Sequence, residues 1–302
     1  MRPLKRLMRL IKPRRKQENK VHFIFHSHGK GEPFPRRQPN RGTSVGIIES
    51  ARGNERHDSI EELAGIPEKY DEYRRQAAQR VIRVIGGEQL DKGALRALRQ
   101  RQSDTDTLFD IADSDPALKN IKLFFSTFAQ ANQMRHRAIK NTIKRELKRG
   151  ETIEATYGTT HSTLIPELRK RGIHPTRRKI GPFQFDKMST IVRRLTLNPR
   201  ERISDEEYYK GFLSIRIFDE ISNRIIFTGA DIQHRMIIML ANTIIDELRE
   251  GEVQTLLRNK QGVAAAIKKR VDFRNAGAYL EKHSPFWRRL NVKQKRELLD
   301  AI

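Results

Sequence analysis

Short runs of β-branched and aromatic residues alternate with longer amphipathic stretches over the first two-thirds of the chain. The runs predict strands at residues 21–25, 44–48, 152–157, 179–185 and 190–197. Between them, apolar positions at helical spacing predict helices over 59–85, 90–101, 115–150 and 162–172. The last third shows helical spacing alone, over 204–219, 231–250, 252–260, 262–275 and 292–302. Strands joined by helical crossovers predict an α/β fold with a mostly parallel sheet and a helical C-terminal region.

Local signals place several of the predicted helix ends. Ser59 and Glu62 have the spacing of a capping box at the start of a helix. Asp115, followed by a proline, is expected to cap the long helix that Gly150 ends. The composition changes near residue 200 and predicts three parts, a basic N-terminal tail at 1–20, an α/β domain at 21–200 and a helical region at 201–302.

The composition narrows the chemistry that the chain can perform. Its 302 residues contain no cysteine, which excludes a disulfide scaffold, a thiolate zinc site, an iron–sulfur cluster and a cysteine nucleophile. Any bound metal is therefore held by histidine and carboxylate side chains. No apolar run approaches the length of a transmembrane helix, and no apolar segment of a secretory signal follows the basic N-terminus. We expect a cytoplasmic protein.

The charge is strongly positive, with 61 Lys and Arg against 37 Asp and Glu, a formal net charge of +24. Two blocks are most basic, residues 1–20 and residues 167–202. Such blocks suit an anionic partner such as nucleic acid or another phosphate-bearing molecule. The candidate residues for that contact are Arg169, Lys170, Arg171, Arg177, Arg178 and Lys179.

Polar side chains follow three of the predicted strands at the point where each strand ends. His26 and His28 follow the first strand, Glu49 follows the second, and His161 follows the strand at 152–157. Because the carboxyl ends of parallel strands meet at one edge of a sheet, these groups are expected to converge. Imidazoles and a carboxylate predict a site for a divalent metal ion, whose identity the sequence leaves open. We expect His161 at the rim of this edge, where it contributes little packing.

The same segments resemble a known superfamily. His28 to Glu32 resembles an opening His-Gly…Glu motif, and Ser44 to Glu49 resembles the strand that ends in the conserved acid of that family. Met134 to Ile139 resembles its Arg-containing helix, and Gly158 to Ile173 is similar to its terminal Gly-x-x-His segment. In this order the motifs resemble the TIKI/TraB/ChaN/erythromycin-esterase-like superfamily over residues 21–175. The resemblance implies an α/β core with a metal-dependent hydrolytic or ligand-binding site.

These observations lead to one preferred function and two alternatives. We expect a metal-dependent hydrolase of an ester, amide or phosphoester, acting on a small molecule or peptide. His28, Glu49 and His161 would hold the metal, with His26 as an alternative or additional ligand. Glu32 or Glu49 would act as the base, and Arg135 would stabilise developing negative charge. The alternatives are a nucleic-acid-binding protein without catalysis and a catalytically inactive ligand-binding protein on the same fold.

Overall fold

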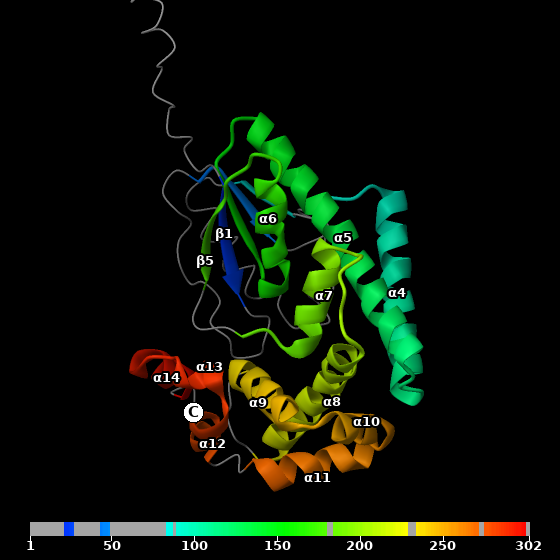
Figure 1. Cartoon of the computed structure of the whole chain (residues 1–302). Helices are drawn as coiled ribbons and strands as arrows, with labels where there is room; N and C mark the ends of the chain where they lie inside the picture. Colours follow the sequence, from blue (N-terminus) through cyan, green and yellow to red (C-terminus); the bar gives the residue numbers. More distant parts are fainter. Residues whose placement is uncertain are drawn as a thin grey trace, which may run out of the picture.

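A single parallel sheet lies at one end of the molecule (Figure 1). The computed structural model describes residues 21–26, 43–48, 83–86, 89–179, 184–228, 234–271 and 275–299. Within them, five strands pair in the order β3-β2-β4-β1-β5, and each pair is parallel. The strands are β1 (Val21–His26), β2 (Val45–Ile48), β3 (Arg83–Gly86), β4 (Ile153–Gly158) and β5 (Thr176–Lys179). The predicted α/β class with a parallel sheet is confirmed.

Helices cover the sheet and form the remainder of the described chain (Figure 1). The helices that precede residue 200 in the sequence are α4 (Lys92–Ser114), α5 (Leu118–Lys148), the 3-10 turn η1 (Thr159–Thr163), α6 (Leu164–Arg169) and α7 (Lys187–Leu197). The C-terminal region contains α8 (Asp205–Thr228), α9 (His234–Glu247), α10 (Glu250–Arg258), α11 (Lys260–Arg270), α12 (Ala276–His283), α13 (Pro285–Arg288) and α14 (Val292–Leu299). The predicted helical C-terminal region is confirmed.

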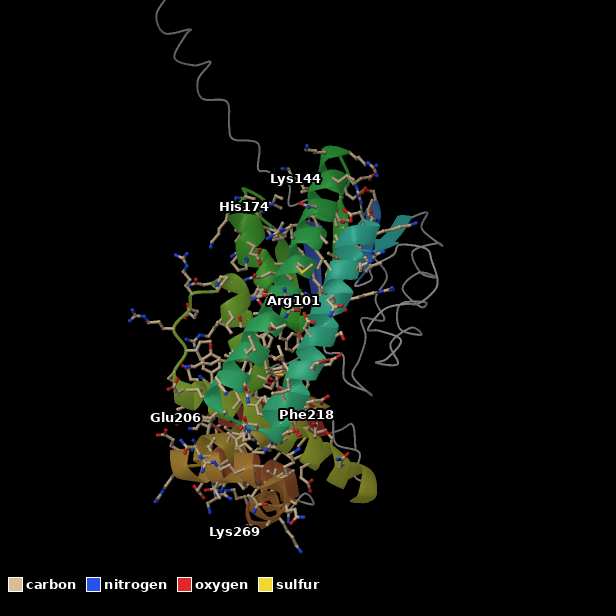
Figure 2. All side chains as sticks on the ribbon, turned by 90° about the vertical axis from the view of Figure 1, so that its right-hand side faces the viewer. Arg101, Lys144, His174, Glu206, Phe218 and Lys269 are labelled. Carbon is tan, nitrogen blue, oxygen red and sulfur yellow. The ribbon has the colours of Figure 1, made fainter. Side chains whose placement is uncertain are left out.

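The buried apolar side chains form two cores that share one helix. The smaller core packs the sheet against α6 and the second half of α5, through residues such as Phe23, Ile143 and Leu168. The larger core contains Phe125, from the first half of α5, together with side chains of α4, α7 and the C-terminal helices. Figure 2 shows α5 running from the helical region near Phe218 to the opposite end of the molecule near Lys144. The larger core therefore draws on residues from both sides of position 200.

Helix α7 occupies a segment for which the sequence predicts a strand at 190–197, and that prediction is wrong. Asp186 accepts a hydrogen bond from the backbone N–H of Ser189 at 2.6 Å and so caps the first turn. Ile191 and Leu195 are buried four residues apart, on the face that packs into the larger core. The cap and this spacing override the strand preference of the β-branched residues.

Other predicted boundaries also need correction, among them the helix predicted over 90–101, which continues to Ser114 as α4. The helix predicted over 59–85 is wrong at its end, because Arg83–Gly86 is a strand whose valine and isoleucine suit a pleated sheet. Its start and its capping box lie outside the described residues. β5 spans Thr176–Lys179 and shares only Lys179 with the strand predicted at 179–185, of which 180–183 lie outside the described residues. Asp115 does not cap α5, because Ala117 occupies the N-cap and Asp115 instead ends α4.

Two glycines end helices where the sequence predicts. Gly150 follows α5 with a φ of +84°, and Gly172 follows α6 with a φ of +75°. Both values lie in the left-handed region, which glycine adopts without the steric cost that a Cβ imposes. The chain therefore reverses after each helix and re-enters the sheet as β4 and β5. In the part of the chain that the structure describes, no helix is both long and apolar enough to cross a membrane.

Candidate functional site

The strands that precede the candidate residues end at the same edge of the sheet. β4 pairs with β1 on one side and with β2 on the other, so their carboxyl ends lie side by side. His26, the last residue of β1, pairs with Gly158 at the end of β4. η1 and His161 follow directly. The parallel arrangement on which the predicted site depends is confirmed.

Most of the predicted metal ligands fall where the structure makes no statement. His28, Glu32 and Glu49 lie outside the described residues, as does the side chain of His26. His161 is thus the one predicted ligand whose side chain is described. No group of three or more histidine and carboxylate side chains that could hold a metal occurs within the described ranges.

His161 is buried, with 1% of its surface exposed, so the prediction that it contributes little packing is wrong. η1 is held between neighbouring elements and contacts β1, α6 and α7. The imidazole of His161 lies 5.5 Å from the ring of Tyr157, centroid to centroid. Its Nδ1 lies 3.1 Å from Nε2 of His136, on helix α5. This contact joins the strand edge to the long helix.

His136 connects His161 to a carboxylate and a lysine. Its other ring nitrogen, Nδ1, lies 3.0 Å from Oε1 of Glu167, on α6. Lys140, four residues further along α5, donates to the second oxygen of Glu167. The result is a chain of four side chains from three elements, running from Lys140 through Glu167 and His136 to His161. His136 itself is almost completely buried.

The charge states of Glu167 and His136 follow from their surroundings. Burial alone would raise the pKa of Glu167, but hydrogen bonds from His136 and Lys140 outweigh it and the pKa is lowered. Burial lowers the pKa of His136 to about 4, although the bond to Glu167 acts in the opposite direction. At neutral pH Glu167 is therefore ionised and His136 is neutral.

These charge states fix the proton positions along the chain. The carboxylate of Glu167 can only accept, so Nδ1 of His136 carries the proton and donates to it. Nε2 of the neutral His136 then accepts a hydrogen bond from Nδ1–H of His161. With the proton of His161 on Nδ1, its second ring nitrogen, Nε2, is the one that can carry a lone pair. That nitrogen is the one able to bind a metal or accept a proton, so His161 has the chemistry of a metal ligand.

Arg135 lies beside this chain but is not part of it. It precedes His136 on α5, is half-buried, and its positive charge contributes to the lowered pKa of His136. The sequence singled out Arg135 and passed over His136 and Glu167. No local pattern identifies those two as partners, since His136 is 25 residues from His161 and 31 from Glu167.

The predicted anion-binding residues lie on two different segments. Arg169 ends α6, and Lys170 and Arg171 follow it; all three are exposed. Arg177 is exposed on β5, the edge strand. The side chains of Arg178 and Lys179 lie outside those that the structure describes.

Comparison of the chain with known proteins does not assign it to a family. No family model, no curated protein and no solved structure matches the chain. The fold and the site define the class on their own, a parallel α/β protein with a buried histidine pair beside the carboxyl edge of its sheet. The resemblance to the TIKI/TraB/ChaN/erythromycin-esterase-like superfamily stays a prediction.

Proposed function

We propose that the carboxyl edge of the sheet is a metal-dependent hydrolytic site to which His161 contributes Nε2. The observation that carries this proposal is the hydrogen bond between Nδ1 of His161 and Nε2 of His136. Histidines that bind metals commonly donate their other ring N–H to a fixed acceptor, which sets the tautomer and the orientation of the ring. His136 is such an acceptor for His161.

The groups behind His136 keep that acceptor in place. Glu167 holds the proton of His136 on Nδ1, and Lys140 neutralises Glu167. An ionised carboxylate would be costly at this depth without both partners. The three side chains therefore act as positioning residues for His161, and none of them needs to touch a substrate.

The remaining ligands are those that the sequence predicts. His28 and Glu49 would complete the metal site with His161, and His26 is the alternative or additional ligand. A divalent ion bound there would lower the pKa of a water molecule and polarise a carbonyl or phosphoryl group. Glu32 or Glu49 would serve as the general base, and Arg135 would stabilise negative charge on the substrate. The substrates we expect are esters, amides or phosphoesters of small molecules or peptides, in the cytoplasm.

Two variants of His161 separate a ligand from a structural histidine. His161→Ala removes the donor to His136 and should lower the free energy of unfolding by about 1–3 kcal/mol, so loss of binding alone would be ambiguous. His161→Asn provides an amide N–H close to the position of Nδ1 but has no counterpart of Nε2. It should keep the stability of the parent and lose the metal.

The measurement is isothermal titration of the purified full chain with Zn²⁺ and with Mn²⁺, beside elemental analysis of the protein as isolated. His174→Asn is the matched control, because His174 is exposed and lies outside the chain of four side chains. We expect the parent and the control to bind one ion, and His161→Asn to bind at least about tenfold more weakly. Equal metal affinity in His161→Asn and the parent would refute the proposal.

The two alternative functions have distinct signatures. Metal binding without turnover of ester, amide or phosphoester substrates favours the inactive ligand-binding protein. The nucleic-acid-binding alternative is supported by the exposure of Arg169, Lys170 and Arg171. It requires affinity that falls steeply with salt and is indifferent to His161.

A further inference from the structure

Arg193, on helix α7, is a half-buried cation stacked on an aromatic ring. The central carbon of its guanidinium lies 3.7 Å from the centroid of the Phe185 ring. Stacking of this kind uses the flat face of the guanidinium and leaves its N–H groups pointing outward in the plane. The ring therefore holds Arg193 in one orientation, with its N–H groups around the rim of the stack.

One N–H on that rim has no acceptor among the described residues. Nε of Arg193 is buried and makes no hydrogen bond to any residue that the structure describes. Leaving a buried charged donor unpaired is costly, and native structures rarely do so without a water, ion or ligand nearby. The position of Arg193 is therefore that of a group prepared for a partner.

A second arginine adds to the cost. Arg177, on β5, pairs in register with Phe23 and lies close enough for its charge to act on Arg193. Burial, and then the charge of Arg177, lower the pKa of Arg193. Within the described ranges, neither of these two arginines forms an ion pair with a carboxylate. Two positive groups thus approach each other without a compensating negative charge.

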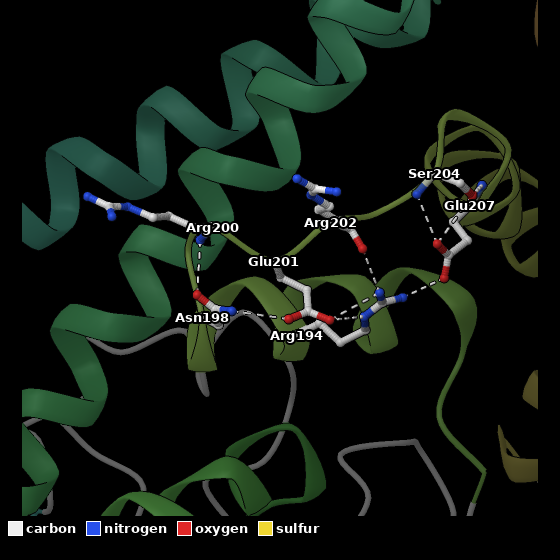
Figure 3. A network of polar contacts seen from close by, with 7 residues as sticks. All are labelled: Arg194, Asn198, Arg200, Glu201, Arg202, Ser204 and Glu207. Carbon is white, nitrogen blue, oxygen red and sulfur yellow. Dashed lines mark hydrogen bonds and ion pairs between the residues drawn. The ribbon is translucent and has the colours of Figure 1, made fainter.

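The next residue of the same helix shows what a paired guanidinium looks like. Arg194 donates to Glu201, Glu207 and the backbone carbonyl of Arg202, which ties the connection between α7 and α8 (Figure 3). Burial opposes the charge of Arg194, but Glu207 and Glu201 raise its pKa above the ordinary value. Arg193 and Arg194 therefore differ in the direction of their pKa shifts, and only Arg193 lacks the negative partner.

We propose that Arg193 and Arg177 form a binding site for the phosphate group of a small ligand. A phosphate seated along the Nε edge of Arg193 would give the orphaned N–H an acceptor and offset both positive charges. Its two negative charges match the two guanidinium groups better than a single carboxylate does. The site is separate from His161 and does not depend on the proposed metal chemistry.

The first measurement compares thermal unfolding in inorganic phosphate with unfolding in chloride of equal ionic strength. Phosphate at about 100 times its Kd should raise the Tm of the parent by about 5 °C. Arg193→Met keeps an unbranched side chain on Phe185 and removes the charge and the orphaned N–H. Its Tm in chloride should equal or exceed that of the parent, and the phosphate-dependent rise should disappear.

The matched control is Arg200→Gln, which makes the same change in net charge. Arg200 is exposed, and its side chain points away from Arg194 and its partners (Figure 3). This variant should keep the full phosphate-dependent rise. Arg177→Gln, at an exposed position, is expected to fold like the parent and to lose most of the rise, which keeps the test valid if Arg193→Met is unstable.

Direct titration calorimetry with inorganic phosphate completes the test, with acetate as a comparison. We expect phosphate to bind the parent and Arg200→Gln with the same affinity. Its affinity for Arg177→Gln and for Arg193→Met should be at least tenfold weaker, and acetate should not bind comparably to any of them. Equal phosphate affinity in all four proteins would overturn the proposal, because binding would then reflect net charge alone. Acetate binding as strong as phosphate binding would overturn the assignment to phosphate.

Discussion

Lowering the pH from about 7.5 to about 4 should remove about 3 kcal/mol of unfolding free energy through a single side chain, His136. Its pKa is about 4 in the folded protein, against 6.5 for an ordinary histidine. As the pH falls through 6.5, the unfolded chain takes up a proton that the folded chain refuses. The stability is therefore present above about pH 6.5 and is lost progressively down to about pH 4.

The charged groups around His136 determine how this effect is isolated. Glu167, which Lys140 binds, lies at Nδ1 of its ring and His161 lies at Nε2, while the charge of Arg135 also lowers its pKa. Protonation of Glu167 in acid also lowers the unfolding free energy, because the pKa of Glu167 is lowered in the folded protein. Measurements on the parent alone therefore do not isolate the contribution of His136. His136→Gln removes the titrating group and leaves the pair of Lys140 and Glu167.

The assay is urea denaturation of both proteins at several pH values in the presence of EDTA. Trp287, the one tryptophan of the chain, is buried and provides a fluorescence signal, with circular dichroism as a second probe. The difference in unfolding free energy between parent and variant should shrink by about 3 kcal/mol from neutral pH to about pH 4. The exposed His174→Gln should show no such change relative to the parent. A difference that stays constant to within about 1 kcal/mol over this range would refute a buried neutral His136.

Three further variants, two that test packing and one that tests a buried ion pair, are checked by urea denaturation at neutral pH. A Cβ added to Gly211 would collide with Ile191, so Gly211→Ala should lower the unfolding free energy by about 1–3 kcal/mol. Gly251, on α10, has open space around it, so Gly251→Ala should raise that free energy by about 0.5–1 kcal/mol. If Gly251→Ala destabilised the protein more than Gly211→Ala, the packing of α7 on α8 would be contradicted. Arg216 is buried and donates from Nε to Asp113 at 2.6 Å, so Arg216→Met should lower the unfolding free energy by about 2–3 kcal/mol. An unchanged unfolding free energy would show that this ion pair between α8 and α4 does not stabilise the protein.

The sheet could be predicted because its signal is local. β1, β2 and β4 are short apolar runs, and the long stretches of sequence between them suit parallel strands, which a tight turn cannot join. The strand order was beyond the sequence, because it depends on which strands pair rather than on the residues of any one strand. The strand prediction for 190–197 was wrong for a related reason. The β-branched residues there favour a strand, but the Asp186 cap and packing into the larger core stabilise a helix.

The candidate site was predictable to the same extent. His161 stands out because it follows a strand after Gly158, a purely local pattern. Its burial and its bond to His136 arise from the packing of α5 and α6 around η1, which the sequence does not encode at any fixed spacing. The same holds for Arg193, which looks like any other basic residue of the block at 167–202. Only the contact with Phe185 and the orphaned Nε distinguish it.

Helix α5 belongs to both cores, with Phe125 in the larger and Ile143 in the smaller. At about 1.5 Å per residue, its 31 residues form a rod about 46 Å long. Unfolding of either core would remove the packing contacts of half of α5 and so weaken the other core as well. The protein is therefore built to unfold as one cooperative unit, and a small tilt of α5 caused by a ligand near His136 would be felt by the helices packed around Phe125.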